Sequence, residues 1–245
     1  MALSKTLQRL TQFFLTTSCP LCQRNASQIF CPDCHRQLME CRWPSSNSGH
    51  AATLASHRPG ANSRDLFIFS WGQYRGPLKQ TLALLKYGNQ TELGLWLGHQ
   101  LGHHWNAHGQ FKTKMQLPVV VPIPLHEDKL KQRGYNQAAL IATGFCRVTG
   151  LPMAEHGLVR TKATEAMYGL GVTQRQANVT GAFQVSPTLK ARTLKARSRT
   201  ILLVDDIYTT GSTARAAATT LKNAGYATTG ITAMAQAVYS SPPDR

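Results

Sequence analysis

Acidic residues are scarce in this chain. Only 11 of its 245 residues are Asp or Glu, against 27 Lys and Arg, which gives a formal net charge of +16. So large an excess of positive charge favours phosphate-rich partners, either nucleic acid or a polyphosphate substrate. A basic surface that serves only solubility is the alternative.

Long apolar runs are also missing. No stretch approaches the roughly 18 apolar residues that a membrane-spanning helix needs, so we expect a protein that does not span a membrane. The first 15 residues have an amphipathic pattern and lack the apolar centre of a secretory signal. We therefore expect a cytoplasmic protein, and its length predicts one domain plus a small module.

Two common nucleotide-binding fingerprints are absent. No Lys follows the glycine at position 211 as a Walker loop requires, and Gly169-Leu170-Gly171 follows no apolar strand and lacks a third glycine. A phosphate site in this chain is therefore expected to be of another kind.

The segment at residues 201–213, ILLVDDIYTTGST, is the most informative stretch. Its four branched apolar residues predict a buried central strand of a parallel sheet, and a helix is expected to begin near Thr213. A helix N-terminus attracts phosphate, and a glycine lets the backbone approach it closely. The residues of this loop that suit a phosphate are Thr209, Thr210, Gly211, Ser212 and Thr213.

Asp205 and Asp206 follow the apolar run directly. Their charge would repel a phosphate, but carboxylates suit the vicinal hydroxyls of a sugar or a hydrated Mg2+ beside it. The segment thus predicts a sugar phosphate lying across the carboxyl end of a strand, where open α/β sheets bind ligands. An ordinary strand–turn–helix with acids at the strand end is the alternative.

Four cysteines near the start of the chain form two C-P-x-C knuckles, at Cys19, Cys22, Cys31 and Cys34. This spacing predicts one tetrahedral, structural Zn2+ site, with disulfides as the alternative. Cys41 is a surplus thiol and His35 a substitute ligand, so the fourth ligand is the least fixed. We expect residues 1–44 to form a zinc-binding module that the metal stabilises.

Small polar residues at 45–64 predict a linker, and residues 65–245 a second domain. Strands expected at residues 66–69, 117–121 and 201–204 alternate with helices, which predicts an α/β fold with a parallel sheet. One helix, expected over residues 93–105, carries His99 and His103 four apart. A solvated histidine face is the preferred interpretation there, and a metal pair the alternative.

The pentapeptide at residues 188–192, TLKAR, is repeated at once at 193–197. This cationic segment predicts a basic loop or extended helix that can hold a nucleic-acid backbone, with a solvated loop as the alternative. Four aromatic residues suit stacking on unpaired bases, although aromatics at such spacing more often belong to a core. They are Trp43, Trp71, Tyr74 and Tyr135.

The pattern at residues 201–213 resembles the phosphoribosyl-pyrophosphate (PRPP) signature of type I phosphoribosyltransferases. That resemblance implies a phosphoribosyltransferase-like parallel sheet. It also implies that Asp205 and Asp206 are catalytic acids that face the ribose hydroxyls, while the following loop wraps the 5′-phosphate of PRPP.

Further motifs occur in a fixed order around this signature. They are the four cysteines, L-K-Y-G at 85–88, V-P-I-P at 121–124, R-G-Y-N-Q at 133–137 and R-x-x-N at 175–178. The set resembles the ComF/ComFC competence proteins and their GntX-like relatives. It implies handling of incoming single-stranded DNA in natural transformation, and PRPP contacts from Val121, Pro122, Arg133 and Arg175. It also implies zinc, Mg2+ with PRPP, and a DNA-uptake helicase or membrane channel protein as a partner.

Catalysis is the point on which the hypotheses differ. By the same resemblance, residues 121–124 lie where a phosphoribosyltransferase places its pyrophosphate loop, and residues 160–178 lie where it places its mobile loop. Pro122 and Pro124 lack the N–H groups that such a loop uses. We therefore favour a PRPP-binding protein that handles DNA. The alternatives are an active phosphoribosyltransferase that transfers ribose 5-phosphate to an unidentified acceptor, and a binding module alone.

Overall fold

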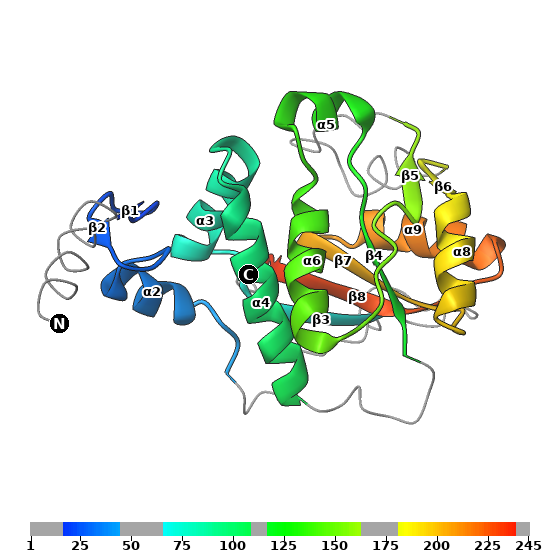
Figure 1. Cartoon of the computed structure of the whole chain (residues 1–245), viewed down its shortest axis with the longest axis horizontal. Coiled ribbons are helices and arrows are strands. Elements are labelled where there is room, and N and C mark those ends of the chain that lie inside the picture. The colour runs from blue at the N-terminus through cyan, green and yellow to red at the C-terminus, as the bar shows by residue number, and fades with distance from the viewer. Residues whose placement is uncertain (1–16, 45–65, 109–116, 163–180, 239–245) are drawn as a thin grey trace, which may run out of the picture.

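The computed structural model describes residues 17–44, 66–108, 117–162 and 181–238 (Figure 1). The expected linker therefore lies outside the described residues, as do Arg175 and most of the expected mobile loop. Among the described residues, no helix is both long and apolar enough to cross a membrane.

A four-stranded parallel sheet forms the centre of the protein, in the order β3-β8-β7-β4. Its strands are β3 (Phe67–Gln73), β4 (Val119–Pro122), β7 (Thr200–Tyr208) and β8 (Ala227–Gln236). Side chains on both faces of β7 are buried, which explains its continuous apolar run. The predicted α/β class and the parallel sheet are confirmed.

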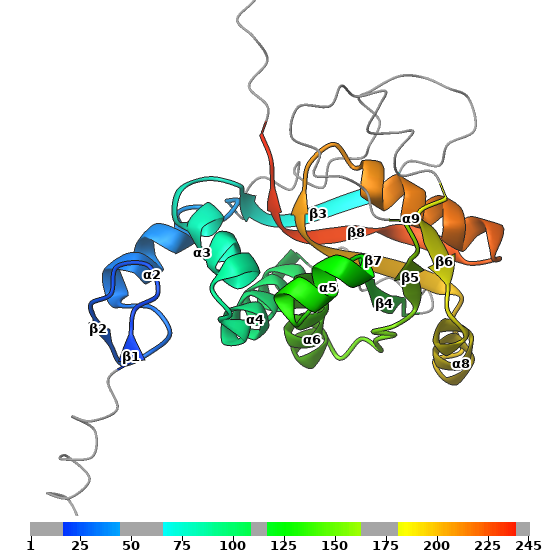
Figure 2. The same cartoon turned by 90° about the horizontal axis from the view of Figure 1, so that it is seen from above.

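Helices cover both faces of this sheet (Figure 2). On one face lie α3 (Gly76–Tyr87), α4 (Thr91–His108) and α6 (Gln137–Thr149), and on the other lies α9 (Ser212–Asn223). Alternate residues of β7 divide between the two layers: Leu202 packs with the first and Leu203 with the second. The expected helices after each strand are thus confirmed.

Two glycines bring α4 and α6 into close contact. A Cβ on Gly98 would lie 2.1 Å from the carbonyl oxygen of Ile141, and one on Gly144 would lie 2.2 Å from that of Leu95. The backbones touch, so α6 has a fixed position against α4.

The N-terminal segment packs on the edge strand β3. It contains β1 (Thr17–Ser18), β2 (Asn25–Ala26) and α2 (Pro32–Met39). The N–H of Trp43 donates to the carbonyl of Trp71 (3.0 Å), and its indole N–H donates to the Ser70 hydroxyl (2.9 Å). Trp43 and Trp71 are buried, so they belong to the core and are not available to stack on bases.

Four smaller elements complete the described chain. They are α5 (Glu127–Arg133), the antiparallel pair β5 (Leu158–Arg160) and β6 (Phe183–Val185), and α8 (Pro187–Lys195). The basic segment before Gly134 forms the helix α5. It has a capping side chain, His126, and ends at Gly134, whose φ of 76° is left-handed.

The duplicated pentapeptide lies mainly in α8. Five residues of helix turn through about 500°, so equivalent residues of the two copies point about 140° apart. Leu189 is accordingly buried, while Leu194 is 66% exposed. The repeat therefore anchors one face of α8 and leaves cations on the other.

Candidate functional site

The acid pair lies within the last part of β7, at the carboxyl end of the sheet. The strand continues past both acids to Tyr208, beyond the acid pair that was expected to mark its end. The last β4 residue in register, Pro122, pairs with Val204, whereas β8 continues beside β7 to its end. From Asp205 onward, β7 therefore has a strand neighbour on one side only, which leaves room for other groups to reach the acids.

Lys86, in the last turn of α3, forms an ion pair with this acid pair. Its Nζ lies 2.7 Å from Oδ2 of Asp206, and the two side chains are only 20% and 14% exposed. Burial alone would lower the pKa of Lys86, but the negative charge and hydrogen bond of Asp206 outweigh it, and the pKa is raised. Lys86 belongs to the L-K-Y-G motif, whose sequence alone assigned it no role.

Asp205 is held by its neighbour. Its Oδ1 accepts the backbone N–H of Asp206 at 2.8 Å. Burial, together with the negative charge of Asp206, raises the pKa of Asp205 to about 8. Near neutral pH its carboxyl is therefore mostly protonated, and it can both donate to and accept from a sugar hydroxyl.

Further cations surround the pair. Burial lowers the pKa of Lys129, and the positive charges of Arg160, Arg133 and Lys86 lower it further. Burial also lowers the pKa of Arg160, which the negative charge of Asp205 partly offsets. These four cations outnumber the two acids, so the region favours an anionic ligand.

The R-G-Y-N-Q motif connects three segments around the site by hydrogen bonds. The Tyr135 hydroxyl donates to the carbonyl of Leu85 (2.7 Å), next to Lys86. Asn136 caps α6 and donates its Nδ2 to the carbonyl of Ile123 (3.0 Å). The motif therefore joins the end of α3 and the V-P-I-P segment to the start of α6.

The contacts of Arg133 are with residues other than the two acids. Its Nη1 donates to Oε1 of Gln137 (3.0 Å), and its guanidinium lies 5.2 Å from the ring centre of Tyr87. The structure thus brings Arg133 near the predicted site, and its contact with PRPP stays a prediction.

The V-P-I-P segment lies beside the acids but offers them no backbone donor. Val121 and Pro122 are buried in β4, and the N–H of Ile123 donates to the carbonyl of Val204 (2.8 Å). Pro122 and Pro124 have no N–H. Between residues 122 and 124 every backbone donor is therefore absent or used within the sheet.

The hydroxyl-rich loop turns at Gly211, whose φ is 72°, and α9 begins at Ser212. The hydroxyls of Thr210 and Ser212 lie 3.2 Å apart. Nη2 of Arg215 donates to the carbonyl of Thr210 at 2.9 Å, which adds a cation that the sequence analysis missed. A phosphate placed here would meet hydroxyls, a guanidinium and a helix N-terminus.

Tyr208 supports this loop from beneath. Its ring is buried, and a Cβ on Gly211 would lie 2.2 Å from its hydroxyl oxygen. Within the described residues that hydroxyl has no hydrogen-bond partner. The contact gives a second reason, besides the left-handed φ, why residue 211 is glycine.

The four predicted cysteines form one group. Their sulfurs all lie within 4.8 Å of one another, and none is in a disulfide. Cys41 lies outside the group, and its Sγ is near the carbonyls of Gln37 and Arg75. His35 instead packs against Trp96, with ring centres 6.0 Å apart. The group fits a single metal ion held by four thiolates.

Arg24 supports the cysteine group. Its Nε lies 3.3 Å from Sγ of Cys22, and its Nη2 lies 3.7 Å from Sγ of Cys31. Donors of this kind steady thiolates that share a metal ion.

The histidines of α4 do not form a metal group in the described structure, where the cysteines are the one cluster of suitable ligands. His103 is exposed, as expected of a solvated face. His104, however, is buried beside Phe69, with ring centres 5.2 Å apart, and burial lowers its pKa to about 4. His104 therefore belongs to the core and not to the solvated face that was expected for His99 and His103.

These observations define an α/β protein with a parallel sheet, a strand–loop–helix site at its carboxyl edge and a four-cysteine group. No protein-family model matches the chain. Competence protein F of Haemophilus influenzae is 26% identical over 213 residues, which cover 82% of this chain and 88% of that protein. DNA utilization protein YhgH of Escherichia coli O157:H7 is 26% identical over 86% of each chain.

A third relative shows a shorter match. Competence protein ComFC of Bacillus subtilis is 31% identical over 109 residues, 44% of this chain and 40% of that protein. The chain is therefore similar to proteins named for competence and for DNA utilization.

Proposed function

We propose that this chain is a cytoplasmic, PRPP-binding protein that handles incoming single-stranded DNA during natural transformation. The names of its relatives, which refer to competence and DNA utilization, support a role in this process. One observation carries the PRPP part of the proposal. An acid pair and a hydroxyl-rich helix N-terminus follow one another on β7–α9, with cations from α3, α5 and β5 around them.

PRPP matches this arrangement group by group. Its 5′-phosphate would lie at the loop of residues 209–213, with Arg215 nearby. Its ribose hydroxyls would face Asp205 and Asp206, which can exchange hydrogen bonds with them. Its diphosphate would then meet Lys129 and Arg160 in place of the backbone donors that residues 122–124 lack.

In this proposal Mg2+ is bound by PRPP and not directly by the protein. The acids offer the right donor chemistry for a divalent ion, but Oδ2 of Asp206 is already bound by Lys86, and Oδ1 of Asp205 accepts a backbone N–H. The pair therefore fits a directly bound Mg2+ poorly, and the diphosphate of PRPP is the better ligand for it. For the cysteine group we propose a structural Zn2+.

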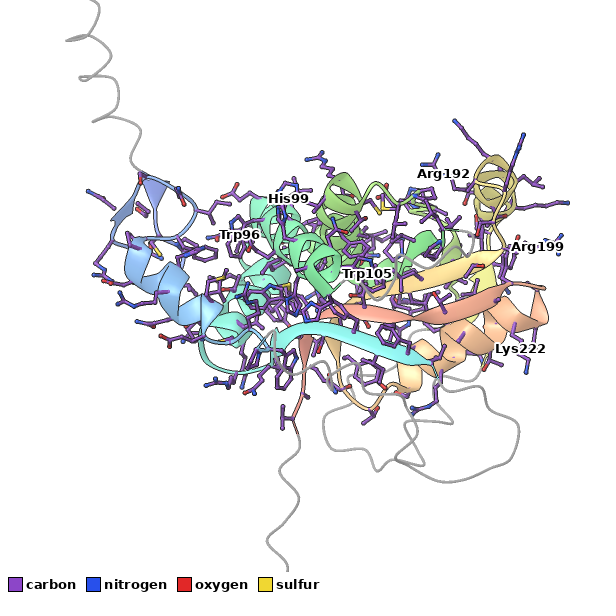
Figure 3. The ribbon with its side chains drawn as sticks, turned by 90° about the horizontal axis from the view of Figure 1, so that it is seen from below. Trp96, His99, Trp105, Arg192, Arg199 and Lys222 are labelled. Carbon is purple, nitrogen blue, oxygen red and sulfur yellow. The ribbon has the colours of Figure 1, made fainter. Side chains whose placement is uncertain are left out.

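DNA would bind at the other end of β7, on a surface that we call the basic end. It comprises Lys190, Arg192, Lys195, Arg197, Arg199 and Lys222. Figure 3 shows Arg192, Arg199 and Lys222 at the end of the molecule farthest from the cysteine module. All six except the half-buried Arg192 are exposed, and none makes an ion pair within the described chain. Unpaired surface cations bind nucleic-acid phosphates by releasing counterions.

Calorimetric titration of the full chain with Mg–PRPP tests the proposed ligand. We expect one site per chain, competition by ribose 5-phosphate and by pyrophosphate, and no release of pyrophosphate without an acceptor. Absence of a binding isotherm would contradict the proposal.

An active phosphoribosyltransferase is the second candidate, and the complete acid pair and loop favour it. In such an enzyme an acceptor replaces the pyrophosphate at C1 of the ribose. Pyrophosphate release that depends on one of a panel of acceptors would favour this candidate over a purely regulatory use of PRPP.

A further inference from the structure

The ammonium of Lys86 occupies a position that a metal ion would otherwise take. It lies 2.7 Å from Oδ2 of Asp206, and both side chains are largely buried. A directly bound Mg2+ needs a carboxylate oxygen at about 2.0–2.1 Å, and it cannot share that oxygen with an ammonium because the two cations repel each other. A metal that binds this oxygen of Asp206 must therefore displace Lys86.

The backbone that carries Lys86 is fixed in place. Leu85 is fully buried, and its carbonyl accepts the Tyr135 hydroxyl at the start of α6. The N–H of Gly88 donates to the carbonyl of Leu84 (2.7 Å) and closes the last turn of α3. The Lys86 side chain thus reaches the acids from a rigid helix end, and only its own rotation can withdraw it.

Withdrawal is opposed by the other charges. Lys129 and Lys86 repel each other, and Lys129 also feels the positive charges of Arg133 and Arg160. The acids that act on Lys86 are Asp206 and, more weakly, Asp205. A rotated ammonium would leave these two partners and move among cations, so the ion pair is the favoured arrangement.

We propose that Lys86 is a built-in counter-cation of the acid pair, which excludes free divalent metal from Asp206 and leaves the acids to bind sugar hydroxyls. As an account of ligand binding, this inference rests on the proposed PRPP function. A ribose hydroxyl can donate to Asp206 while Lys86 stays, because a carboxylate accepts several hydrogen bonds. The divalent ion would then arrive only on the ligand's diphosphate.

Mn2+ alone is the probe, because its binding can be followed by electron paramagnetic resonance without PRPP. The full-length protein is compared with Lys86→Gln and with Lys79→Gln, which removes an exposed charge from the same helix. We expect Lys86→Gln to bind Mn2+ at least tenfold more tightly than the unaltered protein, and Lys79→Gln to match the latter. Adding Asp206→Asn to Lys86→Gln should abolish the gain.

Three results would overturn the inference. They are micromolar Mn2+ binding by the unaltered chain, equal affinity of Lys86→Gln, and a gain that persists without Asp206. Lys86→Arg keeps the charge and should exclude Mn2+ as the unaltered chain does, so a tenfold gain for this variant would also count against the inference. A separate PRPP titration of the unaltered chain tests the proposed function, so failure of one does not imply failure of the other.

Discussion

The charged side chains at the two ends of β7 differ in pairing and in exposure. At its carboxyl end, Asp206 pairs with Lys86, and Asp205 accepts a backbone N–H, all largely shielded from water. At its start, Arg197 and Arg199 are exposed and make no ion pair in the described structure. Paired, shielded groups recognise a ligand by short hydrogen bonds, whereas unpaired surface cations attract polyanions over longer distances and depend on salt. One strand thus presents a selective site and an unselective surface.

The largest expected effect comes from removing the acids. Asp205→Asn with Asp206→Asn should weaken PRPP binding at least 100-fold, because the ribose hydroxyls lose the carboxyl groups that bind them and Lys86 is left without its charged partner. Single-stranded DNA affinity should stay within about twofold. Calorimetry measures the first and fluorescence anisotropy the second.

The matched control for the acids is Glu127→Gln with Asp128→Asn. These acids of α5 are exposed, at 72% and 78%, and the control likewise replaces two carboxyl groups by amides. An unchanged PRPP affinity in the first double variant, or an equal loss in the control, would remove the acids from the site.

The basic end gives the next largest effect. Lys190→Gln, Lys195→Gln and Lys222→Gln together should lower DNA affinity about tenfold or more at low salt. If each contacts one phosphate, the slope of log K against log salt should become shallower by about 2, at roughly 0.7 for each single-strand contact. PRPP affinity should not change.

Three cations elsewhere serve as the control for the basic end: Lys79, Lys131 and Arg147. All are exposed, and neutralising them makes the same change in net charge. Equal losses of DNA affinity in the two triple variants would show that net charge matters and not the location of the basic end.

Gly211→Ala should weaken PRPP binding about tenfold. The new Cβ would collide with the Tyr208 hydroxyl and would strain a left-handed backbone, so the loop must shift. Gly150→Ala has a similar φ of 73° but no atom within 4 Å of the new Cβ, and it should lose stability without losing PRPP affinity. Calorimetry on both variants separates these effects, and equal PRPP affinities would contradict the prediction.

The smallest expected effect is one of pH on stability. The pKa of Asp205 is about 8 when folded, against about 3.9 when unfolded. The folded state therefore binds more protons than the unfolded state between these values, so the contribution of Asp205 to stability falls as pH rises. Below about pH 4 the contribution is complete, and above pH 8 it is lost.

Asp205→Asn removes that proton from both states. Urea unfolding at pH 5, 6 and 7 should show the stability of the unaltered protein falling relative to this variant. Parallel pH profiles would mean that Asp205 is ionised in the folded protein.

Local patterns predicted much of the fold and part of the site. The run before Asp205 is buried on both faces, and such strands are continuously apolar, so β7, the loop and α9 followed from it. The cysteine group could also be predicted from the sequence, because a two-residue gap between cysteines lets two sulfurs reach one ion.

Other features had weak or no local signals. Helix α5 has no buried residue, so it shows no apolar period to distinguish it from a loop. His104 lies three positions after the buried Leu101, and this helical spacing was an available signal for its burial. The partnership of Lys86 with Asp206 joins residues 120 apart in sequence and depends on how α3 is held against α6. No single-sequence pattern carries that information.

The most direct test of the account is anisotropy of labelled single-stranded DNA, measured over a salt series with and without Mg–PRPP. The two contrasting proteins are the acid-pair variant and the basic-end variant. We expect the acid-pair variant to bind DNA with an unaltered salt slope, whether or not Mg–PRPP is present. We expect the basic-end variant to bind DNA weakly and with a shallower slope. DNA binding that is lost with the acids and kept without the basic end would contradict it.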